Sequence, residues 1–172
     1  MAREYTPSTR NRAAFEQLTE TVGNVPPQAL ELEEAVLGAL MLEKDAVIEV
    51  QEYLKAAAFY SEQHRIIYEA ITELSTELKP IDLYTVTERL KSKRQLKAAG
   101  GPAYLAKLTQ KVGGAANLTF HAQIVAQKYV QRELIRSATE IQRRSYDEEQ
   151  DVTDLIGFAE QEIFNVSEGY VK

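Results

Sequence analysis

The chain has 172 residues, with 26 acidic against 20 basic side chains, a formal net charge of −6, two histidines and no cysteine. The absence of cysteine excludes disulfide frameworks, iron–sulfur clusters and thiol nucleophiles. A negative net charge is the wrong sign for a protein that coats nucleic acid with its whole surface. No apolar run approaches the roughly 20 residues of a membrane span, and the N-terminus lacks a signal-peptide core, so we expect a cytoplasmic protein without a membrane partner.

The first two-thirds of the chain consist of a polar stretch followed by a series of short helices. Residues 1–24 are polar and lack a sustained apolar period, so we expect a flexible tail. Over residues 25–114, apolar residues recur at the three- and four-residue steps of amphipathic helices. Ser61 and Asp82 are placed to cap two of these helices. We expect five helices, beginning at Ala29, Asp45, Ser61, Asp82 and Pro102. The second should end near Lys55, and the fifth at Gly113-Gly114.

The last third of the chain predicts a long helical hairpin over residues 115–168. Asn117 can cap a helix of about 30 residues, or about 45 Å. Because a globule of this size has a radius of gyration near 15 Å, that helix should protrude. A second helix should begin at Asp151 and end near Ser167, and the short connection over 146–150 makes the pair an αα-hairpin. With no alternating strand pattern and no Asn-Gly or Asp-Gly turn, we predict an all-α protein: a compact multi-helix body followed by this hairpin.

Both hairpin helices carry more apolar surface than one antiparallel neighbour can cover. The predicted main face of the second helix holds Val152, Leu155, Ile156, Ala159, Ile163 and Val166, with Phe158 and Phe164 lying off that face. Unpartnered apolar surface of this kind marks interaction sites, so the hairpin should mediate self-association. The candidate interface residues are Val125, Tyr129, Leu134, Ile135, Ala138, Ile141, Leu155, Phe158, Ile163 and Phe164.

The sequence offers little catalytic chemistry. No glycine is followed by lysine, so the chain holds no P-loop, and we expect no cofactor and no nucleotide hydrolysis by this chain alone. His64 and His121 are far apart in sequence, which favours structural or partner-facing roles over a metal site. The many carboxylates form no pattern that separates a catalytic pair from a solvated face. We therefore expect no catalytic, cofactor-binding or metal-binding residue.

Two basic clusters leave a second interpretation open. The first lies in 88–97 and consists of Arg89, Lys91, Lys93, Arg94 and Lys97; the second lies on the long helix and consists of Lys128, Arg132, Arg136 and Arg143. Charge runs are more often solvated helix faces, but both clusters could contact phosphates. The alternative function is thus a small helical nucleic-acid-binding regulator that uses Arg89–Lys97.

Five sequence blocks in a fixed order resemble a known family. They are Pro26-Pro27 with the segment 30–40, then Phe59-Tyr60 followed by His64-Arg65, then Pro80-Ile81-Asp82-Leu83, then Gly100-Gly101 with Tyr104-Leu105, and finally Ala115-Ala116-Asn117. In this order they resemble the N-terminal domain of bacterial replicative DNA helicases of the DnaB type. A departure is Phe120-His121, where the family often carries a tyrosine before the alanine.

The resemblance implies a role in assembly and docking. It implies that protomers pair through the C-terminal hairpin, that three dimers form the collar of a hexamer, and that the collar receives the helicase-binding domain of primase. Candidate primase-docking residues at the hairpin tip are Arg143, Arg144, Tyr146 and Asp151. In the family a linker and an ATPase domain follow, which bind ATP, magnesium and DNA; we expect residues 169–172 to begin that linker. The chain is then either an excised domain or a stand-alone paralogue.

Overall fold

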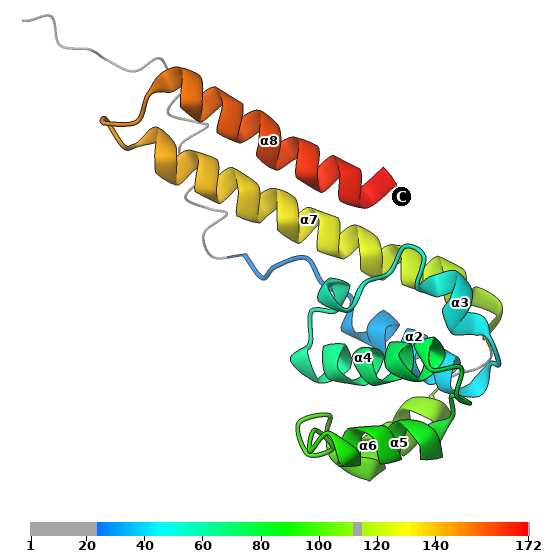
Figure 1. The fold of residues 1–172 in the computed structure, drawn as a ribbon. Helices are drawn as coiled ribbons and strands as arrows, with labels where there is room; N and C mark the ends of the chain where they lie inside the picture. The colour runs from blue at the N-terminus through cyan, green and yellow to red at the C-terminus, as the bar shows by residue number, and fades with distance from the viewer. Residues whose placement is uncertain (1–23, 112–114, 172) are drawn as a thin grey trace, which may run out of the picture.

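The computed structural model describes residues 24–111 and 115–171. Within these residues the chain forms seven α-helices, two short 3-10 helices and no strand, which confirms the all-α prediction (Figure 1). The body contains α2 (Leu30–Leu42), α3 (Ala46–Val50), η1 (Ala56–Ala58), α4 (Glu62–Thr76), α5 (Leu83–Ser92) and α6 (Gly101–Gln110). After η2 (Ala115–Asn117), α7 (Leu118–Ser145) and α8 (Val152–Val171) form the hairpin. The predicted tail and the predicted helix end at Gly113-Gly114 lie outside the described residues, apart from Asn24.

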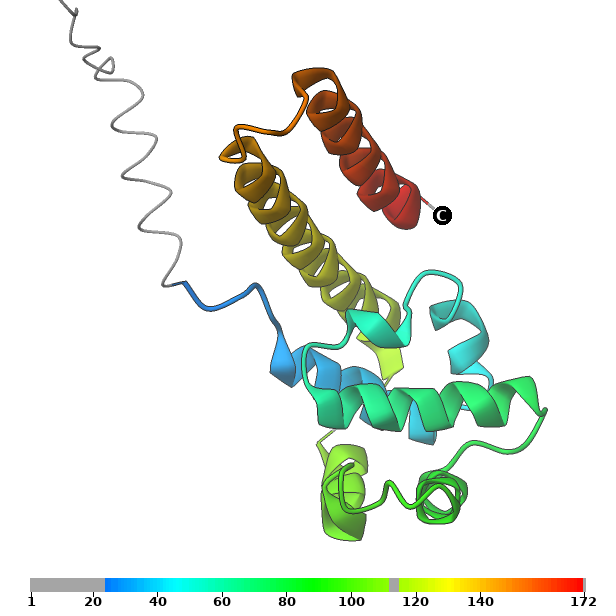
Figure 2. The same cartoon turned by 60° about the vertical axis from the view of Figure 1, so that its left-hand side comes forward.

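The centre of the body is α2, which contacts α4, α6 and α7. From Val36 to Met41 every residue of α2 is buried, as expected for a helical segment that is apolar all round. Figure 2 shows α4 crossing α2, with α5 and α6 on the side of the body away from the hairpin. The core therefore surrounds α2, and the first half of α7 completes it through Ala122 and Val125.

Local signals determine most helix starts in the body. The Ser61 hydroxyl accepts a hydrogen bond from the His64 amide at 3.5 Å, and the Asp82 carboxylate accepts one from the Thr85 amide at 2.8 Å. Both side chains are the N-caps that the sequence predicted. The prediction for the second helix was wrong, because α3 ends at Val50. The chain turns there, and Leu54 becomes buried while its carbonyl accepts a hydrogen bond from the Tyr68 hydroxyl at 2.6 Å.

Gly100 makes the turn between α5 and α6 possible. Its φ of +100° lies in the left-handed region, and a Cβ atom there would lie 1.9 Å from Gln63 Nε2 and 2.8 Å from Tyr104 Cδ1. Both the backbone conformation and the close approach thus require glycine. Helix α6 begins at the next residue, with a proline in its first turn as predicted.

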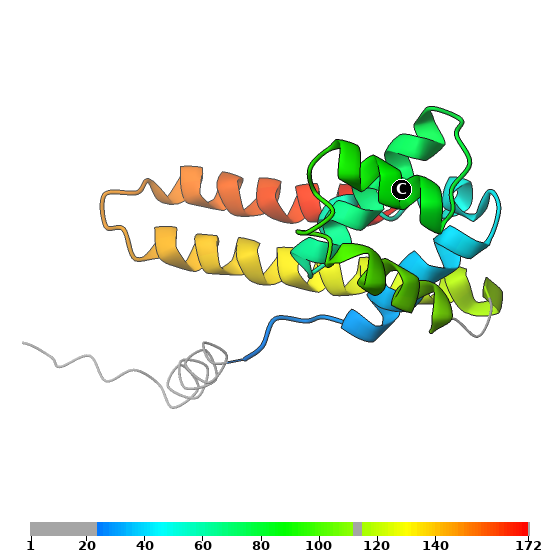
Figure 3. The same cartoon turned by 90° about the horizontal axis from the view of Figure 1, so that it is seen from below.

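The hairpin extends well past the body. At 28 residues, α7 is about 42 Å long. Its first half packs on the body, and its second half continues beyond it with α8 alongside, as Figures 1 and 3 show. The Asp151 carboxylate caps α8 by accepting hydrogen bonds from the Thr153 and Asp154 amides at 2.9 and 3.1 Å. Two details differ from the prediction: Asn117 makes no side-chain cap bond, and α8 continues to Val171.

Candidate interaction surface

Helix α8 is thinly packed for its length. None of its described side chains is buried, although the helix has 20 residues. On α7, Ser137 is the one buried residue after Val125 within the described chain. A helix gains most of its stability from packing an apolar face, so two helices with so little buried surface stabilise each other only weakly. The hairpin therefore leaves apolar surface available for another partner.

Three contacts fix how α8 faces α7. The guanidinium carbon of Arg144 lies 3.7 Å from the centre of the Phe158 ring. Two turns further down, the Ser137 hydroxyl donates to Glu162 Oε2 at 3.1 Å, and Arg136 donates to the same oxygen at 3.3 Å. The half-buried residues that face α7 are Leu155, Phe158, Ala159, Glu162 and Val166.

This orientation corrects the predicted faces of the second hairpin helix. Phe158, placed by the sequence off the α7-facing side and at the interface, packs against α7 instead. Ile156 and Ile163, placed by the sequence on the main apolar face, do not face α7 and are 55% and 47% exposed. The apolar spacing could not determine which side of α8 faces α7, because apolar residues occupy more than half of the circumference of α8. The polar and cation–π contacts of Arg144 and Ser137 select one rotation.

The remaining apolar residues form one surface on the side of the hairpin away from the body. At about 100° per residue, Ala138 lies half a turn around α7 from Tyr129, which packs toward the body. Leu134 and Ile141 lie beside Ala138, and the exposed stripe of α8 adjoins them because the two helices are antiparallel. We call this surface the outer face and define it by Leu134, Ala138, Ile141, Val152, Ile156 and Ile163.

The other candidate interface residues lie elsewhere. The prediction of Val125 as an interface residue was wrong, because its side chain is 1% exposed in the core of the body and has no surface left for a partner. Tyr129 is half-buried at the junction of body and hairpin. Ile135 and Phe164 are 52% and 58% exposed but point to the flanks of the hairpin. Leu134, Ala138, Ile141 and Ile163 thus remain as predicted interface residues on the outer face.

Arg132 anchors the hairpin to the body. Its guanidinium donates to the carbonyls of Pro27 and Ala58, each at 2.7 Å, and lies over the rings of Tyr60 and Tyr129 at 5.4 and 5.7 Å. Burial lowers the pKa of this guanidinium. The phosphate contact that the sequence left open is therefore disfavoured for Arg132, because both of its terminal nitrogens already bind carbonyls.

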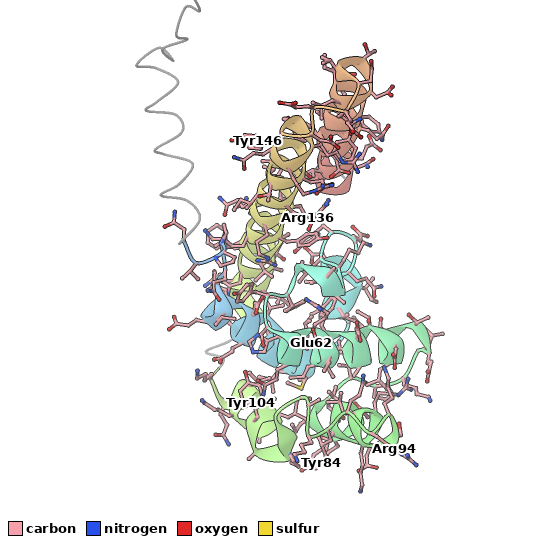
Figure 4. The ribbon with its side chains drawn as sticks, turned by 90° about the vertical axis from the view of Figure 1, so that its left-hand side faces the viewer. Glu62, Tyr84, Arg94, Tyr104, Arg136 and Tyr146 are labelled. Carbon is pink, nitrogen blue, oxygen red and sulfur yellow. The ribbon has the colours of Figure 1, made fainter. Side chains whose placement is uncertain are left out.

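The hairpin tip combines paired charges with one exposed ring. Arg143 and Arg144 donate to Glu140 at 2.7 and 3.0 Å, and these hydrogen bonds lower the pKa of Glu140 to about 2. Tyr146 is 67% exposed and projects from the end of α7, as Figure 4 shows. Of the four docking candidates, three therefore make intramolecular polar contacts, whereas the Tyr146 side chain makes no hydrogen bond to a described residue.

The fold and sequence match known proteins. The chain covers 99% of a crystal structure of the N-terminal domain of DnaB helicase from Mycobacterium tuberculosis, with a TM-score of 0.77 and 36% identity over 82% of this chain. A family model, the DnaB-like helicase N-terminal domain, matches residues 25–127. The chain belongs to this family. The DnaB N-terminal fold also occurs in a DnaB-like replicative helicase described with its interactions with primase, at a TM-score of 0.69 and 22% identity over 83% of this chain and 32% of that one.

Curated relatives of this DnaB N-terminal domain are much longer proteins. A replicative DNA helicase DnaB of Rhodothermus marinus is 40% identical over 163 residues, which is 95% of this chain and 17% of that relative. Across six such relatives, the chain spans between 16% and 32% of their length. The family match thus establishes what kind of domain this is.

In this DnaB N-terminal domain the first basic cluster is largely neutralised. Arg89 donates to Glu77 at 2.6 and 2.8 Å and to Glu73 at 3.1 Å, and Lys93 also pairs with Glu73. Hydrogen bonds from Arg89, and then from Lys79, lower the pKa of Glu77 to about 2. Lys91 also lies 4.0 Å from Glu88, so three of the five cations are paired, which weakens the alternative of a nucleic-acid-binding regulator.

A buried polar network, which the sequence did not indicate, joins three helices of the body. Glu33 on α2 and His64 on α4 are 1% and 3% exposed, with His64 Nδ1 2.8 Å from Glu33 Oε2. The Tyr104 hydroxyl of α6 lies 2.6 Å from His64 Nε2, and burial raises its pKa to about 12. The Glu33 carboxylate also accepts hydrogen bonds from the Tyr60 and Ser61 amides at the start of α4. His64 thus has a structural role.

Two further features concern residues 24–111 and 115–171. No group of three or more His, Asp or Glu side chains there is arranged to hold a metal ion. No helix in the same ranges has the length and apolar character needed to cross a membrane. His121 is half-buried, with its ring centre 6.4 Å from that of Phe120.

Proposed function

We propose that this chain is the N-terminal collar domain of a hexameric replicative helicase, which pairs protomers through the outer face and offers the hairpin tip to primase. The observation that carries the proposal is the packing of α8, which has no buried side chain among those described while Ile156 and Ile163 stand half-exposed on a shared apolar surface. Large exposed apolar surfaces rimmed by polar residues mark protein–protein interfaces. Three such dimers would complete a hexamer.

The relatives support this proposal. They are replicative DNA helicases, and a protein of the same fold is described by its interactions with primase. We extend that partner to this chain, and we assign ATP, magnesium and most DNA contacts to the further domains of a full-length helicase. The chain itself contains no Gly-Lys pair and hence no P-loop. Its own contribution is assembly and docking.

Two neighbouring residues of α8 provide a matched test of assembly. Ile163 and Phe164 are both large, apolar and about half exposed, but Ile163 lies on the outer face and Phe164 on the flank. Ile163→Asp would place an unpaired carboxylate in the contact, at a cost of several kcal/mol if it is desolvated. In sedimentation velocity we expect Ile163→Asp to be monomeric and Phe164→Asp to assemble like the wild type, both with unchanged helicity. Assembly of both variants at wild-type strength would contradict the proposal.

Primase docking is tested at the hairpin tip. The helicase-binding domain of the cognate primase is titrated by calorimetry into the wild type, Tyr146→Ala and the control Tyr84→Ala, whose ring is 80% exposed on α5 at the other end of the molecule (Figure 4). We expect Tyr146→Ala to weaken binding without changing sedimentation, and Tyr84→Ala to bind normally. No binding to the wild type would remove primase from the proposed function and leave assembly.

The same titration tests whether the docking site is shared between two hairpins. A shared site exists only in the assembled form, so the monomeric Ile163→Asp variant should lose primase affinity together with assembly. Full-strength binding to that monomer would show that one hairpin is sufficient for docking.

A further inference from the structure

We propose that the sequence segment 13–23 docks, within its own chain, in a cavity between the body and the hairpin. The cavity, which we call the junction cavity, has a volume of about 890 Å³ and is lined by the segment before α2, by the body and by α7. A segment docked there contacts the body and the hairpin together and so holds the hairpin in place. The inference concerns a single chain and does not depend on the proposed assembly.

The junction cavity brings together exposed apolar side chains from three parts of the chain. Val25 precedes α2, Tyr60 precedes α4 and Ile135 belongs to α7, and all three line the cavity while remaining exposed. Single exposed apolar residues are common, whereas apolar residues that converge on one cavity mark a binding site. Ile135 is also the α7 residue on the flank that the outer face does not include. The cavity therefore suits an apolar occupant.

The junction cavity is also positively charged. The guanidinium groups of Arg65, Arg132 and Arg136 line it, and Glu133 supplies the one carboxylate among its described lining residues. Glu133 pairs with Arg136, whereas Arg132 binds carbonyls. In a chain with a net charge of −6, this local excess of positive charge favours an acidic occupant.

Arg65 provides a specific donor for such an occupant. One of its terminal nitrogens donates to Glu62 at 2.7 Å, and the other donates to the Phe59 carbonyl at 3.4 Å. Its Nε is buried and has no hydrogen-bond partner within residues 24–111 and 115–171. An unpaired buried donor destabilises a fold, so an acceptor that a docked segment supplies is favourable.

The sequence of segment 13–23 has the complementary chemistry. Its large apolar residues are Phe15, Leu18 and Val22, and its charged residues are Glu16 and Glu20, with no cation among them. Residues 1–12 differ, because they contain three arginines and one glutamate. An apolar segment with two carboxylates thus matches the walls and the charge of the junction cavity, and the more N-terminal part of the sequence does not.

The attachment of this segment brings it to the junction cavity. Asn24, the residue that follows the segment, lines the cavity, and the Pro27 carbonyl accepts a hydrogen bond from Arg132 at 2.7 Å, which holds this part of the chain beside α7 (Figure 3). Glu20 is four residues before Asn24, and four residues span at most about 14 Å. We therefore pair Glu20 with Arg65. Because the segment is tethered next to its site, a modest intrinsic affinity is sufficient for docking.

Isoleucine methyl resonances in NMR spectra test the docking without a label at the site. Ile135 lines the junction cavity, and Ile48 on α3 is the control, because the two side chains are 52% and 54% exposed. The full chain is compared with a chain that begins at Asn24. We expect the Ile135 resonance to move when residues 1–23 are removed and the Ile48 resonance to stay in place. An Ile135 resonance that is identical in the two chains would overturn the inference.

Two full-length variants with the same change in charge test the role of the carboxylate. Glu20→Lys alters the segment that we place in the cavity, and Glu4→Lys alters the sequence before it. In Glu20→Lys the Ile135 resonance should move towards its position in the truncated chain, because a lysine is repelled by the guanidinium groups of the cavity. In Glu4→Lys it should stay at the wild-type position. Equal shifts in both variants would contradict the pairing of Glu20 with Arg65.

A mixing experiment tests whether the segment occupies the cavity of its own chain. The isotope-labelled truncated chain is mixed with an excess of the unlabelled full chain. Docking within one chain predicts that the labelled Ile135 resonance does not move, because each full chain fills its own cavity. Movement towards the position seen in the full chain would show that the segment docks on a second copy, and the intramolecular contact would be wrong.

Discussion

The guanidinium carbon of Arg144 lies 3.7 Å from the centre of the Phe158 ring, and this contact sets the rotation of α8 against α7. With Phe158 turned inward, Ile156 and Ile163 are turned outward. A cation over an aromatic face contributes about 0.5–1 kcal/mol at an exposed site, enough to select between two rotations with similar apolar packing. The outer face is therefore a consequence of a contact inside the hairpin.

Truncating Phe158 should destabilise the hairpin, whereas truncating Phe164 should not. Phe158→Ala loses ring burial and the Arg144 contact, so we expect the free energy of unfolding to fall by about 1–3 kcal/mol. Phe164→Ala removes an exposed ring and should stay within about 0.5 kcal/mol of its parent. Urea unfolding is followed by circular dichroism in the monomeric Ile163→Asp background, so that association does not contribute. Equal losses in the two variants would show that Phe158 does not pack against α7.

The buried carboxylate of Glu33 should be essential to the body. Glu33→Ala leaves His64 and the amides at the start of α4 without their acceptor, and breaking a buried pair costs on the order of 3–5 kcal/mol. Glu31→Ala, on the exposed side of the same helix, is the control and should change little. Midpoints of urea unfolding that coincide for the two variants would contradict the structural role of the network.

The parts of this fold that could be predicted from sequence are those that depend on local signals. Ser61 and Asp82 lie at the start of apolar-periodic segments, and a cap acts on amides two or three residues away. The buried side of α4 follows in the same way from the helical spacing of Ile67 and Ile71. The long hairpin was also predictable, because about 30 residues contain no glycine or proline.

The parts that could not be predicted depend on partners far away in sequence. Glu33 is the one buried glutamate among the three of α2, and its burial is explained by His64, 31 residues later. The rotation of α8 against α7 depends on the contacts of Arg144 and Glu162. Charged residues are not part of an apolar pattern, so that pattern could not predict the rotation. The role of Arg132 could not be predicted for the same reason, because the spacing of a basic residue on a helix does not show what it binds. In the structure it binds the carbonyls of Pro27 and Ala58.

Acid should weaken the tip through Glu140. Arg143 and Arg144 lower the pKa of this carboxyl to about 2 from 4.5, so the folded chain holds the carboxylate more strongly than the unfolded chain does. The contribution to stability is complete above pH 4.5 and is lost as pH falls towards 2. The Tm of the wild type should exceed that of Glu140→Gln by a small constant amount above pH 5, and the difference should vanish near pH 2. A difference that is independent of pH down to 2 would contradict the lowered pKa.

Nucleic acid should bind weakly and with strong salt dependence. The chain has a net charge of −6, and Arg89 and Lys93 are already paired with Glu73 and Glu77. Binding to a fluorescent DNA duplex is measured at several salt concentrations, where purely electrostatic binding falls steeply as salt rises. A tight, sequence-selective complex near physiological salt would instead favour the regulator that uses Arg89–Lys97.

Hydrogen exchange of α8 as a function of protein concentration tests the central claim most directly. Amide protection depends on the local free energy of opening, and α8 buries no described side chain within one chain. If the outer face holds protomers together, protection of α8 and of the second half of α7 should rise with concentration, while protection of α2 and α4 should stay constant. Protection of α8 that is the same from the most dilute to the most concentrated sample, in a chain that self-associates, would show that the protomers meet elsewhere.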